Sequence, residues 1–183
     1  MKPGVRLLLV GINPGLRSAA VGHHFAGHSN RFWKLLAESK LVPVPLSYRE
    51  DHRLPEFGIG LTNIIGKPSR GIDSLTTAEY RTGRKRLLAK VKRFKPRMVA
   101  LLGITIYRVL FHDEAGRPLR RIRPGLSTQT LGGVPIFVLP NPSGRNAHAS
   151  YAKAPSKSPT GIRTRACDRL QWVHTSRCRW GWA

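Results

Sequence analysis

Two short polar segments near opposite ends of the chain each interrupt an apolar run, and this pairing limits the folds that the sequence can adopt. The segment 11–15 (GINPG) follows the apolar run 6–10, and the segment 141–145 (NPSGR) follows the run 134–139. Both runs are typical of buried strands that stop at turns containing Asn, Pro and Gly. If these strands are parallel in one sheet, both loops leave from its carboxyl edge, where open α/β sheets bind ligands. We therefore expect the two loops to face one pocket.

Strand and helix patterns alternate between these two loops. Ser29 can cap a helix over about 30–40, in which Phe32, Leu35 and Leu36 share one face. The polar stretch 43–57 is expected to be a surface loop, and 58–65 returns inward as a short strand or buried turn.

A second helix is predicted to begin at Thr76, because Glu79 follows at the spacing of a capping box. It runs to about Phe94, and Pro96 stops it. A buried strand at 98–102 and a helix after Gly103 follow. The alternation predicts an α/β fold in which helices cover both faces of a mainly parallel sheet.

The charge of the chain indicates its partners. The 183 residues suffice for one domain, and 32 Lys and Arg against 9 Asp and Glu give a formal net charge of +23. A polyphosphate is the expected partner, and an anionic membrane surface is the alternative.

No apolar run reaches the roughly 20 residues that span a bilayer, and 1–4 leads into a strand without signal-peptide spacing. We expect a soluble, intracellular protein, and the two cysteines, Cys167 and Cys178, agree with a reducing compartment.

The last segment differs in character from the rest. Residues 153–183 contain seven basic residues against the single acid Asp168, and they have no helical or strand period. One interpretation is a disordered basic arm that strengthens nucleic-acid binding. The other, which the three tryptophans favour, is a change of reading frame near Tyr151. Either way, we predict a folded domain over 1–151 and a tail over 152–183.

Several segments together resemble one enzyme family, the mismatch-specific uracil and thymine DNA glycosylases of the uracil-DNA glycosylase superfamily. The matching segments are 11–16 (GINPGL), 22–25 (GHHF), 30–33 (NRFW), 58–63 (GIGLTN) and 141–145 (NPSGR). They occur in the family's order across about 5–151. The resemblance implies a three-layer α/β/α fold with a central, mainly parallel sheet. It also implies a monomeric, cytoplasmic and nucleoid-associated hydrolase that needs no metal or cofactor.

The resemblance further implies the reaction. Members of this family hydrolyse the N-glycosidic bond of uracil or thymine opposite guanine in double-stranded DNA, and the abasic product is a second expected partner. The base must be flipped out of the duplex, which is easiest at a mismatch. Asn13 matches the residue that positions the attacking water, and the backbone amides of Ile12 and Leu16 would stabilise the departing base. Because an amide is not a strong base, a slow enzyme is expected.

The remaining motif residues are expected to form the base pocket. Phe25 matches the aromatic residue that stacks on the flipped base, and His24 matches a histidine of the thymine-active branch. Ser18 matches a small polar residue of the bacterial uracil-type branch, so thymine excision is less expected than uracil excision. Asn30 resembles a pocket residue that reads the pyrimidine edge, and Asn63 is expected to support the site.

The second loop is expected to act on DNA. Arg145 matches the wedge that fills the gap left by the flipped nucleotide. Ser143 and Gly144 offer a hydroxyl group and close backbone approach to phosphate, and Asn141 begins this motif.

Other interpretations remain beside this one. The basic helix over 81–95 is either a solvated face, which is commoner, or a DNA contact. His23, His24 and His28 suggest a metal, but no Cys or carboxylate lies at ligand spacing nearby, so no metal site is expected. A non-catalytic nucleic-acid-binding module of the same fold is the main alternative function. A phosphate-binding βαβ protein is another, although the chain lacks the glycine-rich motifs of that class.

Overall fold

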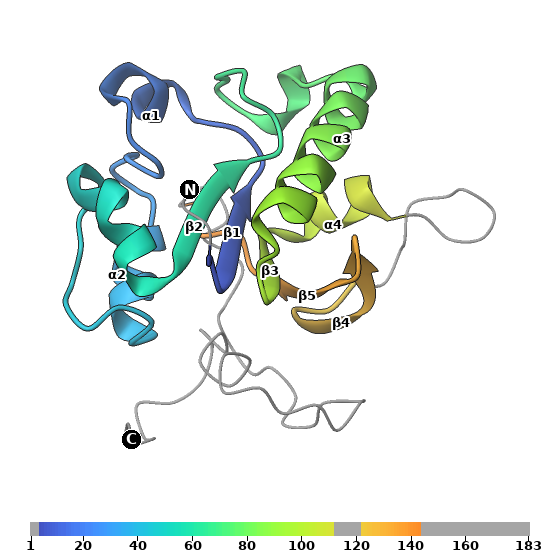
Figure 1. The fold of residues 1–183 in the computed structure, drawn as a ribbon. Coiled ribbons are helices and arrows are strands. Elements are labelled where there is room, and N and C mark those ends of the chain that lie inside the picture. The colour runs from blue at the N-terminus through green and yellow to red at the C-terminus, as the bar shows by residue number, and fades with distance from the viewer. Residues whose placement is uncertain (1–3, 112–121, 144–183) are drawn as a thin grey trace.

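The computed structural model describes residues 4–111 and 122–143, and a five-stranded sheet forms its centre (Figure 1). The strand order is β2-β1-β3-β5-β4. Four strands are parallel, and β4 pairs antiparallel with β5 at one edge. The strands are β1 (Leu7–Gly11), β2 (Ile59–Asn63), β3 (Met98–Leu102), β4 (Gly125–Leu131) and β5 (Val134–Leu139). This arrangement confirms the predicted α/β fold with a mainly parallel sheet.

The register of the parallel strands brings their carboxyl ends to one edge. Gly11 pairs with Asn63 at the ends of β1 and β2, and Leu102 pairs with Leu139 at the ends of β3 and β5. The loops that follow β1 and β5 therefore leave from the same edge, as the sequence predicted.

Helices cover both faces of the sheet, which makes three layers (Figure 1). Because side chains alternate along a strand, Val10 and Leu101 face one core, which includes residues of α3 (Thr77–Phe94) and α4 (Ile104–Leu110). Leu9 faces the opposite core, together with residues of α2 (Phe32–Glu38) and the 3₁₀ segment η1 (Tyr48–Phe57). Two short elements, α1 (Leu16–Val21) and η2 (Ile72–Ser74), follow the carboxyl ends of β1 and β2.

Two expectations about the first half of the chain need correction. The first predicted helix is shorter than 30–40, and Asn30 rather than Ser29 accepts the Phe32 backbone N–H at 3.0 Å. The stretch 43–57 is not simply a surface loop. Its second part forms η1, where Leu54 is 1% exposed within the core that contains α2. A polar composition hid this element because only its few apolar side chains face inward.

The second half agrees better with the sequence. The Glu79 N–H donates to Thr76 Oγ1 at 3.2 Å and the Thr76 N–H donates to Glu79 Oε2 at 2.7 Å, which confirms the capping box. Strand β4 was not anticipated, because most of its residues are polar and all except Leu131 are at least partly exposed. The proposed tail at 152–183 lies outside the described residues, so the domain boundary stays a prediction.

None of the described helices has the length and apolar character needed to cross a membrane.

Close contact between α3 and the segment after β2 depends on Gly83, a buried residue inside the helix. A Cβ at this position would meet the Ile64 carbonyl oxygen closer than atoms normally approach, with the carbonyl carbon at 3.0 Å. The neighbouring group is backbone, so it has little freedom to move aside. Gly83 therefore sets how closely α3 approaches the sheet.

We predict that Gly83→Ala destabilises the protein. Alanine normally stabilises a helix interior by about 1 kcal/mol relative to glycine, but overpacking a filled site costs about 1–3 kcal/mol. Denaturant unfolding should therefore give a lower free energy of unfolding for Gly83→Ala. The exposed neighbour Thr82→Ala is the matched control and should be neutral or stabilising. A more stable Gly83→Ala would contradict the close contact.

Candidate functional site

Asn13 lies in the loop after β1, and its side-chain amide nitrogen is held by three acceptors. Nδ2 donates to Ser69 Oγ at 2.8 Å and lies 3.2 Å from both the Lys67 and Pro14 carbonyl oxygens. Carbonyl oxygens only accept hydrogen bonds, so the atom that faces them is the NH₂ group. The hydrogen bonds recorded for this side chain within the described residues all use Nδ2. This arrangement turns Oδ1 into the acceptor that is available to a ligand.

The loop after β2 supplies two of these acceptors and was missed by sequence reasoning. The Ser69 hydroxyl donates to the Gly71 carbonyl at 2.6 Å and accepts from Asn13, while the Ser69 N–H donates to the Pro14 carbonyl at 3.2 Å. The Lys67 ammonium contacts Glu79 Oε1 at 2.9 Å, which ties this loop to the start of α3. The signal was present, because this segment also follows the carboxyl end of a predicted parallel strand.

Glu79 remains a carboxylate far into the acid range. The Thr76 N–H and then the Lys67 ammonium are the largest of the favourable contacts, and they lower the pKa of Glu79 to about 2. The loop that holds Asn13 is thus joined to the N-terminus of α3 by a persistent negative charge.

Gly11, at the end of β1, has no side chain and so leaves room for two predicted site residues to meet. A Cβ at Gly11 would lie 2.5 Å from Asn63 Oδ1 and 3.2 Å from Phe25 Cζ. Any larger residue would displace the amide or the ring. Gly11 therefore allows Phe25 and Asn63, which are far apart in the sequence, to approach the same point beside Asn13.

Phe25 is held in an unusual backbone conformation. Its φ is 54°, in the left-handed region that non-glycine residues rarely occupy. One face of its ring stacks on Phe32, with centroids 4.1 Å apart and planes 21° from parallel. Phe32 is fully buried, whereas Phe25 is only partly so. Strained residues of this kind persist where surrounding contacts hold them, often at functional sites.

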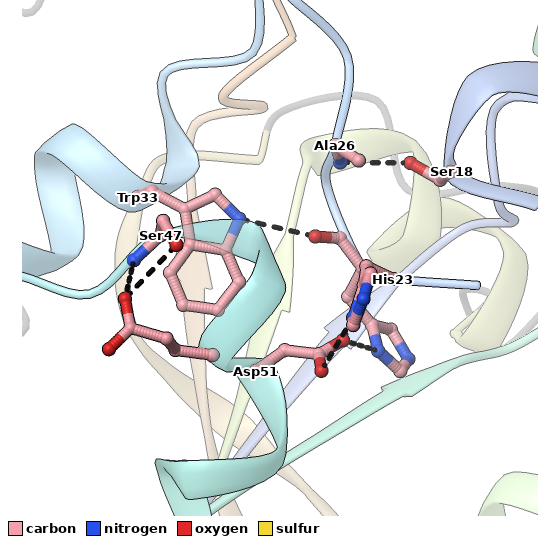
Figure 2. A network of polar contacts seen from close by, with 8 residues as sticks. Ser18, His23, Ala26, Trp33, Ser47 and Asp51 are labelled. Carbon is pink, nitrogen blue, oxygen red and sulfur yellow. Dashed lines mark hydrogen bonds and ion pairs between the residues drawn. The ribbon is translucent and has the colours of Figure 1, made fainter. Parts of the chain in front are cut away.

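Three side chains outside the loop 22–30 hold it in place, and Figure 2 shows those of Ser18 and Trp33. Ser18 Oγ accepts the Ala26 N–H at 3.0 Å, and Arg17 Nε donates to the Ala26 carbonyl at 2.9 Å. Trp33 Nε1 donates to the His24 carbonyl at 3.1 Å. Ser18 and Trp33 thus contact the backbone on both sides of Phe25, and Ser18 is buried by this contact.

Asp51 is a further anchor that sequence reasoning did not find. Its Oδ2 accepts the His24 N–H at 2.9 Å, and its two oxygens contact the Nδ1 atoms of His23 and His24 at 3.1 and 3.2 Å (Figure 2). No carboxylate lies at ligand spacing from these histidines in the sequence, but η1 brings Asp51 to them from a distant part of the chain. Burial raises the pKa of Asp51, but the His24 amide and both imidazole rings outweigh it and hold that pKa below its usual value.

The two motif loops meet through the backbone. The Arg31 N–H donates to the Pro142 carbonyl at 3.0 Å, which joins the start of α2 to the loop after β5. Asn30 Oδ1 accepts the Phe32 N–H, and Asn141 Oδ1 accepts the Ser143 N–H, each at 3.0 Å. Both asparagine carbonyls are thus used in turns, which leaves their NH₂ groups to face other partners.

Two other predicted residues flank Asn13. Ile12 is buried, and its carbonyl accepts the Ile65 N–H at 2.9 Å. Leu16 is the first residue of α1 and is 48% exposed. Gly144 and Arg145 lie outside the described residues, so their roles stay predictions. In the part of the chain that the structure describes, no group of three or more His, Cys, Asp or Glu side chains is arranged so that it could hold a metal ion, and this includes Asp51 with His23 and His24.

We predict that Asp51→Ala loosens the loop that carries Phe25. Losing a hydrogen bond to a charged group costs about 1.5–3 kcal/mol, so the His24 amide should exchange with solvent at least about 10-fold faster. The exposed Asp73→Ala is the control and should leave this amide unchanged. In the wild type the same protection should begin to decline as the pH falls below about 4, the ordinary carboxyl value, and disappear once the pH is below the depressed pKa of Asp51, because only the ionised form is stabilised. Unchanged exchange in Asp51→Ala would refute the anchor.

Comparison with known protein families agrees with this geometry. Residues 1–160 match the family model described as "Uracil DNA glycosylase superfamily". The match includes every element that holds Asn13, Phe25 and Asn63. Since it covers most of the chain, this protein belongs to the uracil DNA glycosylase superfamily, whose members are hydrolases that act on uracil in DNA.

Proposed function

We propose that this protein removes uracil mispaired with guanine from double-stranded DNA, and thymine less readily. Within the superfamily, the motif segments that surround Asn13 resemble the mismatch-specific branch. The observation that carries the proposal is the fixed amide of Asn13 at the carboxyl edge of the sheet. The resemblance of loop 141–145 to the DNA-contacting loop of this branch is the second support.

The fixed amide suits a dissociative hydrolysis. Asn13 Oδ1 would accept a hydrogen bond from a water, which turns the water's free lone pair toward the sugar carbon. As the bond from C1′ to N1 breaks, the pyrimidine leaves with the electron pair, and the sugar develops oxocarbenium character. The water oxygen then bonds to C1′ and its proton is lost to solvent. Asn13 orients the water without deprotonating it, because an amide is not a base of the required strength.

The residues around Gly11 suit a flipped pyrimidine. The ring of Phe25 is already stacked on Phe32, which preorganises it as a platform for a base. Asn63 and Asn30 supply amide groups of the kind that pair with a pyrimidine edge. Mispaired nucleotides cost least to unstack, so a pocket of this kind favours G·U over A·U before any contact with the guanine. Arg145 would then fill the gap in the duplex, a role that rests on the resemblance.

The decisive measurement is single-turnover base release from duplexes that carry G·U, G·T or A·U, in the absence of metal. We expect G·U to react fastest, with A·U well below it. Asn13→Ala should slow release from G·U by at least about 100-fold, because an unpositioned water attacks poorly. Binding to the same duplex should change little.

Two results would contradict this proposal. Comparable release by Asn13→Ala would remove its assigned role. No release by the wild type, together with intact duplex binding, would favour the non-catalytic binding module instead.

We further predict that Asn13→Asp does not release uracil faster than the wild type does. The replacement turns a carboxylate oxygen toward the Lys67 and Pro14 carbonyls, where the wild type presents NH₂. Oxygen facing oxygen without a proton repels, so the side chain should leave its position and the free energy of unfolding should fall by about 1–3 kcal/mol. Base release and chemical denaturation of Asn13→Asp, beside Asn13→Ala, test this. Faster release by Asn13→Asp than by the wild type would show that the three contacts do not matter.

A further inference from the structure

The solvent side of α3 carries a dense set of cations that the site described above does not use. We call this set the α3 basic face, and all of its members are exposed: Arg81, Arg84, Lys85, Arg86, Lys92 and Arg93. From residue 80 to residue 112 the sequence contains no Asp or Glu. The face therefore has no acidic residue of its own helix to neutralise it, apart from Glu79 at the helix start.

The opposite side of α3 is already occupied by the protein core. Gly83, Leu87 and Val91 are buried in the packing against the sheet. A helix that binds a membrane surface needs an exposed apolar side to insert between lipids, and α3 does not present one. A purely cationic, water-exposed surface instead suits the phosphates of a nucleic acid.

The first half of the face lies beside the candidate site. Lys67 both accepts from Asn13 through its carbonyl and contacts Glu79 at the start of α3 through its ammonium. From there α3 runs back toward the amino edge of the sheet, because the next strand, β3, is parallel to β1. Lys92 therefore lies about 17 Å farther along the helix axis than Arg81.

A duplex whose flipped base enters the site extends beyond it in both directions. Such a duplex carries about one phosphate charge per 1.7 Å of its axis, so phosphates next to the lesion come close to the start of α3. We propose that Arg81, Arg84 and Lys85 bind these flanking phosphates and form a second DNA contact. This inference rests on the proposed function only in that DNA enters at the carboxyl edge of the sheet.

The test compares two double variants of the full chain, each of which removes two charges from the same helix. Arg81→Gln/Lys85→Gln lies near the site, and Lys92→Gln/Arg93→Gln lies far from it. Glutamine has a helix propensity close to that of lysine and arginine, so both variants should fold. The readout is fluorescence anisotropy with an undamaged duplex several turns long, over a series of salt concentrations. We expect the slope of log K against log salt to fall by about 2 for the near pair, and by less than half of that for the far pair.

Three outcomes would overturn the inference. Equal changes of slope in both pairs would mean that the net charge of the protein attracts DNA and that no specific contact forms near the site. No change in either pair would remove α3 from the DNA surface. A loss of binding to anionic phospholipid vesicles, with an unchanged DNA slope, would assign the face to membranes.

Base release at saturating enzyme separates this inference from the proposed function. The far pair should release uracil from G·U at the wild-type single-turnover rate, because Lys92 and Arg93 belong neither to the pocket nor to the proposed phosphate contact. If the wild type releases no base while the two slopes differ, the proposed function fails and the α3 contact stands. If the wild type releases uracil while the near and far pairs give equal slopes, the proposed function stands and the α3 contact fails.

Discussion

The hydrogen-bonded register of the parallel strands is the constraint on which the candidate site depends. Gly11 and Asn63 pair at the ends of β1 and β2, and Leu102 and Leu139 pair at the ends of β3 and β5. The loops that follow therefore begin at one level and meet above the sheet. A shift of one residue in any of these pairings would turn buried side chains to the other face and separate the loops.

Three of the nine acidic residues of this chain hold backbone in place. In each of three cases a carboxylate accepts a backbone N–H: Asp51 from His24, Glu50 from Ser47 and Glu79 from Thr76. Asp51 fixes the loop that presents Phe25, and Glu79 joins the helix α3 to the loop that holds Asn13. In a chain with only 9 acids against 32 Lys and Arg, Asp51 and Glu79 thus hold segments of the candidate site in place.

The site residues differ in how far the sequence could predict them. The loop that carries Asn13 was found because it follows a recognisable apolar run, and Asn63 was named because 58–63 resembles a glycosylase motif. Local pattern also gave the cap of α3 at Thr76. Asp51 was missed because it comes from a polar segment with no period, and its partners lie 27 and 28 residues away. Ser69 was missed because its role is a hydrogen bond across 56 residues to Asn13.

The sequence by itself determined the four parallel strands, the main helices and the polar loops that interrupt them, because these follow from hydrophobic period, capping and turn chemistry within a few residues. Only the tertiary structure decided that Nδ2 of Asn13 is the side-chain atom held by protein acceptors. It alone also decided that Phe25 and Asn63 meet beside Gly11. Those features depend on distances between segments far apart in the chain. Such distances are set by the packing of both cores against the sheet, which no local pattern encodes.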